Sequence, residues 1–319
     1  MTIGDIGAQV AGLGTALPAR VVSNAEATAH VDADDEWVRR RTGITERRWA
    51  APDAQLADLA AEAGRCALVD ANLSSTDVDL LLVATFTADH LAPHAAPLVA
   101  DALGLGRAGA IDVGAACAGF VSALTLGGAM IEARRAARVL VIGAEILSRH
   151  TDGTDRQTAA LFGDGAGAIV LEATQRGRLG PAVLGADGAR SALIVAPRST
   201  GLIAMNGHEV FQHAVARMRA ATLQACAAAE LTLADVDLFV FHQANARILA
   251  SLAHRLGLPE ERVVEAIAHT GNTSSASIPL ALEHARQDGR LRHGSRVLLA
   301  AFGAGFVWSA VTLTWGRGG

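Results

Sequence analysis

The feature that most constrains the fold of this chain is a partial repeat of its own sequence. LSSTDVDLLLV (Leu73–Val83) resembles LTLADVDLFVF (Leu231–Phe241), which begins 158 residues later. RVLV (Arg138–Val141) resembles RVLL (Arg296–Leu299) at the same offset of 158 residues. Two matches in one register, at about half of the 319 residues, predict two homologous halves.

Each half shows the same order of helix, strand, helix and strand patterns. The expected elements are helices near Leu56–Ala71 and Val215–Glu230, strands at Leu80–Ala84 and Leu238–Phe241, helices at Gly119–Arg135 and Ser277–Gln287, and strands at Val139–Gly143 and Val297–Ala301. Continuous apolar strands between helices predict parallel sheet covered on both faces. Because both sheets need helical cover, we expect an α/β fold layered αβαβα, with halves 1–174 and 175–319.

Composition excludes several classes of protein. The chain is 51% hydrophobic and only 18% charged, so it can bury a large core and is not expected to be disordered. Its net charge of −5 and lack of tyrosine argue against nucleic acid as a partner. No long uncharged apolar run or secretory signal is visible, so we expect a cytoplasmic protein with no membrane span. Three widely spaced cysteines predict neither a disulfide framework nor a zinc site.

One cysteine stands in a run of very small residues, DVGAACAGF (Asp112–Phe120). Cys117 is expected in the turn or first helical residue that follows an apolar strand. The position 158 residues later is Ser275, inside HTGNTSSAS (His269–Ser277), which also precedes a helix. If the halves pack about a pseudo-twofold axis, the two turns converge on one site.

The position of Cys117 suggests a nucleophile. A helix N-terminus stabilises negative charge, so we expect the pKa of this thiol to be lowered. Nearby backbone N–H groups could then receive an oxyanion. The alternative is that a lone cysteine is a small buried hydrophobic residue, and we prefer that interpretation for Cys66 and Cys226 on alanine-rich helices.

Two polar residues are candidates to assist Cys117. FHQANAR places His242 just past the end of a buried strand, where ligands bind in parallel sheets. Asn272 lies in a glycine-containing loop and, through the repeat, opposite the cysteine turn. Each alone could be an ordinary loop histidine or turn asparagine. The repeat favours the functional interpretation of both.

Four motifs in order carry a family resemblance that spans nearly the whole chain. DVGAACAGF, FHQANARI, HTGNTSSASIP and AFGAGFVW together resemble the β-ketoacyl-acyl-carrier-protein synthase III family. The resemblance implies the thiolase fold, two duplicated halves in five layers, and a homodimer. It implies an acyltransferase that condenses thioesters and needs no metal or redox cofactor.

The resemblance also implies catalytic roles. Cys117 would attack an acyl-CoA and hold the acyl group. His242 and Asn272 would stabilise the enolate formed when malonyl-acyl carrier protein loses carbon dioxide, and this carbanion would attack the acyl-cysteine. The backbone N–H groups of Cys117 and Ala304 would form the oxyanion hole. Two neutral donors suit an enolate oxygen because they add no competing base.

Further residues are implied to bind CoA or the carrier. DEWVRRRTGI (Asp35–Ile44) resembles the CoA-binding segment, with Trp37 stacked on adenine, Arg156 on its other face and Arg41 on phosphate. The remaining residues are Thr42, Phe211 and Asn245 along the substrate tunnel and Arg247 for carrier docking, while Gln212 replaces a common cation. We also expect a basic cluster of Arg39, Arg40, Arg41, Arg47 and Arg48. Trp37 could instead be a core aromatic, and the arginines a solvated face.

Three departures from the family concern the substrate pocket. Ala92 stands where some relatives carry a phenylalanine that borders the acyl pocket of the partner subunit, so we expect acceptance of more than acetyl. His94 and His208 are unusual near the tunnel; each could contact a polar group or simply be a hydrogen-bonded histidine. The segment Gly177–Met205, which helps to cover the pocket, is short.

Other functions stay open beside condensation. The same acyl-cysteine could pass its acyl group to a different acceptor, as in starter-unit loading for polyketide-type metabolism. A non-catalytic partner subunit is disfavoured because Cys117 is present. A dinucleotide enzyme is disfavoured because FGDGAGA (Phe162–Ala168) precedes a strand rather than a helix.

Overall fold

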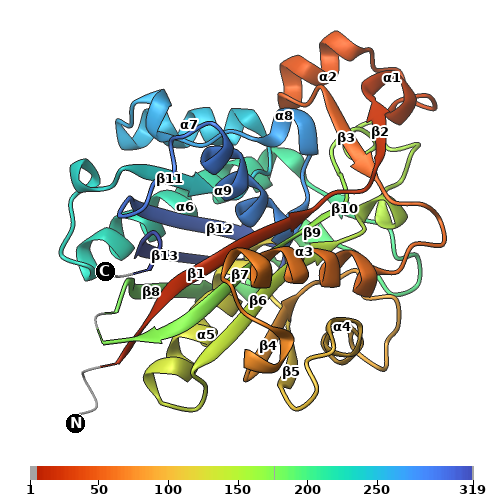
Figure 1. The fold of residues 1–319 in the computed structure, drawn as a ribbon. Helices are drawn as coiled ribbons and strands as arrows, with labels where there is room; N and C mark the ends of the chain where they lie inside the picture. Colours follow the sequence, from red (N-terminus) through yellow and green to blue (C-terminus); the bar gives the residue numbers. More distant parts are fainter. Residues whose placement is uncertain (1–5, 176, 318–319) are drawn as a thin grey trace.

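The computed structural model describes residues 6–175 and 177–317 as two mixed sheets with helices between and outside them (Figure 1). The first sheet has the strand order β1-β7-β6-β4-β5. Its strands are β1 (Gly7–Ala16), β4 (Leu80–Ala84), β5 (Gly109–Val113), β6 (Arg138–Glu145) and β7 (Gly165–Thr174). The second sheet has the order β11-β12-β13-β8. Its strands are β8 (Leu179–Ala186), β11 (Leu238–Phe241), β12 (Arg296–Gly303) and β13 (Val307–Thr314).

The prediction of parallel sheets is only partly correct. Strand β4 pairs in parallel with β5 and β6, and β11 pairs in parallel with β12. The remaining ladders, β6–β7, β1–β7, β12–β13 and β13–β8, are antiparallel. Residues 304–306 between β12 and β13 are too few for a parallel crossover, so this pair is antiparallel. The longer connection between β6 and β7 contains the 3-10 helix Leu147–His150 and no crossover α-helix.

The helices form three layers around the sheets, which gives the expected αβαβα thiolase architecture (Figure 1). Helices α5 (Gly119–Glu132) and α9 (Ser277–Gln287) contribute the central core together with the inner faces of both sheets. Helices α3 (Leu56–Asp70) and α4 (Ala95–Leu103) cover the outer face of the first sheet. Helices α6 (Gly207–Ala228) and α7 (Ala246–Leu256) cover the second.

The sequence repeat reappears as a structural repeat. Helices α5 and α9 begin at Gly119 and Ser277, which are 158 residues apart. The 3-10 turns that precede them, Ala116–Ala118 and Ser274–Ala276, keep the same offset. Both sheets share one connectivity, except that β5 is matched only by an isolated parallel bridge between Phe239 and Val263. The predicted junction at residues 174 and 175 falls between β7 and β8 and stays a prediction.

A smaller cap lies beside this body, and its N-terminal part is at the upper right of Figure 1. It contains the hairpin of β2 (Arg20–Ser23) and β3 (Glu46–Trp49), the pair β9 (Ile194–Val195) and β10 (Ala204–Met205), and the helices α1 (Asn24–Ala27), α2 (Asp35–Thr42) and α8 (Ile267–Thr270). Val22, Val38 and Ile44 pack there against Phe162 and Ile203. The cap therefore holds the predicted CoA-binding segment against both halves.

Among the described helices, none is both long and apolar enough to cross a membrane.

Candidate active site

Cys117 lies in the Ala116–Ala118 turn, directly before α5, as expected. Ala116 adopts φ +44°, a left-handed conformation that costs a non-glycine residue about 1 kcal/mol. The end of β12 packs tightly against this turn: a Cβ added to Gly303 would lie 2.8 Å from the backbone nitrogen of Cys117. Neighbouring strand and turn thus hold the cysteine backbone in a strained, fixed geometry.

The matching turn of the second half meets the cysteine turn, so the predicted convergence is confirmed. Ser274 has φ +48°, close to the angle of Ala116, and its side chain hydrogen-bonds the Cys117 thiol. The Ser274 backbone N–H donates to Asn272 Oδ1 over 2.9 Å. This bond fixes the orientation of the Asn272 amide. Within the described part of the chain, the Asn272 Nδ2 group has no hydrogen-bond partner and is free to donate.

His242 follows β11 and is almost completely buried, with its Nδ1 atom 2.6 Å from Ser277 Oγ. The Ser277 oxygen also accepts the Gln243 N–H, and we assign its own proton to the bond with Nδ1. The other ring nitrogen, Nε2, therefore carries the proton. Burial lowers the pKa of His242 to about 3, which keeps the ring neutral. His242 is thus a neutral N–H donor.

The expectation of a lowered thiol pKa at Cys117 is wrong for this structure. Protein surrounds the sulfur atom, although the residue keeps part of its surface open to the cavity. Burial raises the pKa of the thiol to about 12, against the bond from Ser274, and a negative charge on the buried carboxyl of Glu145 would raise it further. Desolvation of the charged thiolate has the largest effect on this pKa, and none of the described groups that shift it is a cation.

A cavity of about 670 Å³ brings most of the predicted residues together. Its wall includes Cys117, His242 and Asn272, together with Trp37, Arg41, Thr42, Arg156, Phe211, Asn245, Arg247 and Ala304. His208 also lines it and hydrogen-bonds Gln212. Ala92 and His94 do not belong to this wall: both lie exposed in and after the loop that follows β4. Parts of the short segment after β8, Ile194–Ala196 and Ile203, complete the lining.

Two arginine guanidinium groups lie over the ring of Trp37. The guanidinium carbon of Arg156 lies 4.6 Å from the ring centroid, and that of Arg41 lies 5.7 Å away. An adenine between Trp37 and Arg156 would have to displace this cation–π contact. Asn245 caps α7 by accepting the Arg247 N–H and donates to the Arg41 carbonyl, which ties α7 to α2.

The predicted basic cluster is smaller than expected. Arg47 is fully buried, where it donates to Val22 O, Asn24 Oδ1 and Ala160 O. Burial lowers its pKa to about 10. Alternation along β3 turns this side chain inward, so Arg47 supports the cap instead of facing a ligand. Of the others, Arg39 and Arg40 pair with acidic residues one helical turn earlier.

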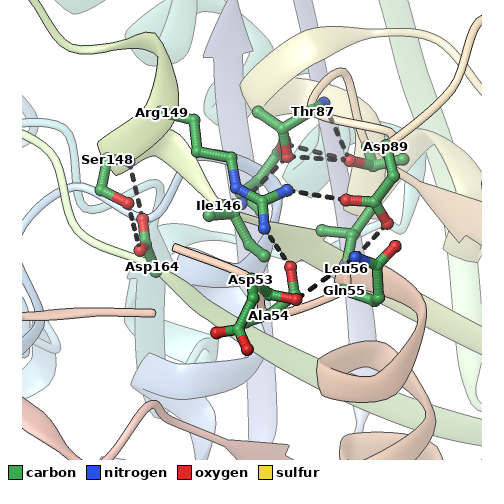
Figure 2. A network of polar contacts seen from close by, with 12 residues as sticks. Asp53, Ala54, Gln55, Leu56, Thr87, Asp89, Ile146, Ser148, Arg149 and Asp164 are labelled. Carbon is green, nitrogen blue, oxygen red and sulfur yellow. Dashed lines mark hydrogen bonds and ion pairs between the residues drawn. The ribbon is translucent and has the colours of Figure 1, made fainter. Parts of the chain in front are cut away.

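Sequence reasoning missed the supporting residues Glu145 and Ser277. Glu145 ends β6 and is fully buried beside Cys117. The loop after β4, which contacts Glu145, is held in place by two interactions (Figure 2). The Ile146 N–H donates to Thr87 Oγ1, and Arg149 forms an ion pair with Asp89 at 2.7 Å. A carboxylate at the end of an otherwise apolar strand was the available signal for Glu145. Nothing in the sequence linked Ser277 to His242.

Comparisons with known proteins show which family this architecture belongs to. The family model described as 3-oxoacyl-[acyl-carrier-protein (ACP)] synthase III matches residues 111–188, and its C-terminal model matches residues 226–315. The chain is similar to beta-ketoacyl-[acyl-carrier-protein] synthase III 2 of Streptomyces coelicolor, with 47% identity covering 98% of this chain and 95% of the relative. It is 46% identical to beta-ketoacyl-[acyl-carrier-protein] synthase III of Cereibacter sphaeroides, over 97% and 99% of the two chains.

Solved structures similar to this chain support the same family. The 3-oxoacyl-[acyl-carrier-protein] synthase III of Aquifex aeolicus superposes with a TM-score of 0.94 at 39% identity, covering 97% of this chain and all of that one. The priming β-ketosynthase of the R1128 polyketide pathway superposes with a TM-score of 0.93 at 37% identity, covering 97% and 96%.

The two-sheet fold and these relatives define a thiolase-fold condensing enzyme, which is an acyltransferase. Within that class, the chain belongs to the 3-oxoacyl-[acyl-carrier-protein] synthase III family.

Proposed function

We propose that the enzyme takes an acyl-CoA and transfers the acyl group to Cys117. The observation that carries this proposal is the presence of Cys117, His242 and Asn272 on the wall of one cavity. The Cys117 sulfur forms a bond to the acyl carbon, the bond from that carbon to the CoA sulfur breaks, and the thiol proton leaves with CoA. The N–H groups of Cys117 and Ala304 would stabilise the oxyanion.

The second substrate in this proposal is malonyl-acyl carrier protein. The N–H of His242 Nε2 and the Nδ2 group of Asn272 would donate to the thioester oxygen of the malonyl group. Loss of carbon dioxide leaves an enolate on that oxygen, and neutral preorganised donors stabilise it without offering a base. Its carbon forms a bond to the acyl carbon, the bond from that carbon to the Cys117 sulfur breaks, and a β-ketoacyl product forms. The sulfur leaves as a thiolate and takes up a proton from water.

The residues around the cavity support this choice of substrates. Trp37 and Arg156 would hold the adenine end of CoA, and Arg41 its phosphate. Thr42, Phe211 and Asn245 would border the pantetheine arm, and Arg247 would contact the acidic carrier. The Thr42 hydroxyl already bonds Val38 O, so it contributes shape more than a free donor.

We propose a homodimer formed along β5. This strand is an edge of the first sheet, and Ile111 at its centre is 53% exposed. Leu91, in the loop that carries Ala92, is 75% exposed. An uncovered strand edge with exposed apolar side chains favours pairing with a second copy of the chain. In such a dimer Ala92 would border the acyl pocket of the partner, where its small size leaves room for chains longer than acetyl.

A second candidate is starter-unit loading through the same acyl-Cys117 intermediate. The observation in its favour is the similarity to the priming β-ketosynthase of a polyketide pathway. The two functions differ in whether carbon dioxide is released when malonyl carrier is added.

Intact-protein mass spectrometry with a panel of acyl-CoAs tests the proposal. We expect an acyl adduct on the wild-type enzyme, with four-carbon or longer chains accepted, and no adduct on Cys117→Ala. The Asn272→Asp variant is expected to form the adduct but to condense about 10²- to 10³-fold more slowly, because a carboxylate repels the enolate. An adduct that persists on Cys117→Ala, or a strict preference for acetyl, would contradict the respective part of the proposal.

A further inference from the structure

The side chain of Glu145 joins the two halves of the molecule behind the reacting groups. It is completely buried, and no ion pair among the described residues includes it. One carboxyl oxygen faces the loop after β4, in the first half. The other faces the Ser274–Ala276 turn, in the second half. This arrangement deepens the proposed function, on which it rests for its activity readout.

The oxygen Oε2 is surrounded by donors. Thr85 Oγ1, Thr87 Oγ1 and the Phe86 N–H lie 3.1, 2.8 and 3.2 Å from it. Each hydroxyl also accepts a backbone bond, from the N–H of Thr87 and of Ile146 respectively. Both hydroxyl protons are therefore available for Oε2. This oxygen acts only as an acceptor and carries no proton.

The oxygen Oε1 has a different environment. Ser274 Oγ and Ser275 Oγ both lie 3.0 Å from it. Ser275 Oγ is also 2.8 Å from the Ala84 carbonyl, which can only accept. A hydroxyl has one proton, so Ser275 donates to only one of these two oxygen atoms. If it donates to the nearer Ala84 carbonyl, it turns a lone pair toward Oε1. The contact is favourable if Oε1 carries a proton and donates it to Ser275.

Ser274 connects this carboxyl to the reaction. Its N–H fixes Asn272 Oδ1, and its hydroxyl bonds both Glu145 Oε1 and the Cys117 thiol. We propose that Glu145 is a positioning residue that acts as a neutral acid: protonated on Oε1, it holds Ser274, and through Ser274 it aligns the Asn272 amide with the Cys117 sulfur.

Two physical arguments favour the neutral form. Burial raises the pKa of Glu145, and the polar groups that face it are hydroxyls, one backbone N–H and the thiol of Cys117, none of them cationic. A carboxylate here would also oppose any negative charge on the sulfur. A neutral acid gives the same orientation without that repulsion.

Glutamine imitates a protonated glutamate in shape and hydrogen bonding, so Glu145→Gln is the deciding variant. Its oxygen can accept the three bonds from the β4 loop while its NH₂ group donates to Ser275. We expect this variant to keep condensation within about threefold of wild type. Glu145→Ala and Ser274→Ala are expected to lose about 10- to 100-fold in kcat, the loss typical when a group that orients a site is removed.

The charge state of Glu145 is tested by the rate at which iodoacetamide alkylates Cys117 between about pH 6 and 9. Mass spectrometry of the Cys117 peptide follows this rate. Exposed Cys66 serves as the internal reference. We expect wild type and Glu145→Gln to react at equal rates. Asp164→Asn is the matched control, because Asp164 is also a fully buried carboxyl, bonded to Ser148 and Ala50. It is expected to lower stability without changing the alkylation rate.

Two results would overturn the inference. If Glu145→Gln accelerates alkylation by about tenfold at each pH, which corresponds to one pKa unit, the carboxyl is ionised. If Glu145→Ala or Ser274→Ala condenses at the wild-type rate, the residue has no positioning role. If Glu145→Ala does not fold, the positioning role is tested with Ser274→Ala and the charge state with Glu145→Gln. Alkylation needs no acyl-CoA, so a wild-type enzyme that forms no acyl adduct refutes the proposed function separately.

Discussion

At the scale of single residues, serines determine what the two candidate donors present to the cavity. Ser277 occupies Nδ1 of His242, and the backbone of Ser274 occupies Oδ1 of Asn272. Each partner fixes a side chain that would otherwise rotate, and each leaves the donor group free. Two neutral donors are thereby preorganised before any substrate binds, which is the condition for electrostatic stabilisation without reorganisation.

The proposed role of His242 predicts how decarboxylation depends on pH. Because its pKa is lowered to about 3 from the ordinary 6.5, the imidazole stays neutral at every higher pH. We expect carbon dioxide release from malonyl carrier by Cys117→Ala to stay constant within about threefold between pH 5.5 and 8. A rate that changes with a midpoint near 6.5, in either direction, would show that the ring titrates there and would contradict the assignment.

At the scale of elements, the repeated turns bring the halves into contact. Ala116 and Ser274 have nearly equal positive φ values, and each opens a 3-10 turn that leads into a central helix. The 3-10 turns after α3 and α6 repeat as well, each with a capping box, formed by Ser74 with Asp77 and by Thr232 with Asp235. The same local chemistry therefore gives the same geometry twice.

The contact between β6 and the Ser274–Ala276 turn leaves no room for a side chain at Gly143. A Cβ there would lie 2.4 Å from the Ser275 carbonyl oxygen. We expect Gly143→Ala to cost about 1–3 kcal/mol of unfolding free energy, as overpacking does, and to slow acylation of Cys117 because the turn must move.

Gly153→Ala is the matched control for Gly143→Ala. A Cβ at Gly153 meets nothing within 4 Å, so this variant should stay within about 0.5 kcal/mol of wild type. Urea denaturation gives both values. Equal stability of the two variants would mean that the turn is loosely packed.

At the scale of the whole molecule, the uncovered edge of β5 predicts association. We expect sedimentation velocity to give a dimer for the wild type. Ile111→Asp should weaken it at least about tenfold, because the dimer would bury an unpaired charge. Val69→Asp, at a position 78% exposed on the outer helix α3, should leave the dimer intact. A monomeric wild type, or equal effects of both substitutions, would remove β5 as the interface.

The sequence alone predicted the duplicated halves, the register of 158 residues, the αβαβα layers and the meeting of Cys117, His242 and Asn272. These features depend on local patterns: apolar strands, amphipathic helices and turns that recur at one spacing. It also implied the tunnel residues, most of which line one cavity.

Only the tertiary structure decided the environment of these residues. Burial raised the pKa of Cys117 where a helix terminus had predicted the opposite, and it turned Arg47 into a support of the cap. Antiparallel returns at β7 and β13 and the convergence of Ser274 and Ser275 on Glu145 join segments far apart in the chain. Desolvation and such contacts depend on which surfaces pack together, and no local stretch of sequence contains that information.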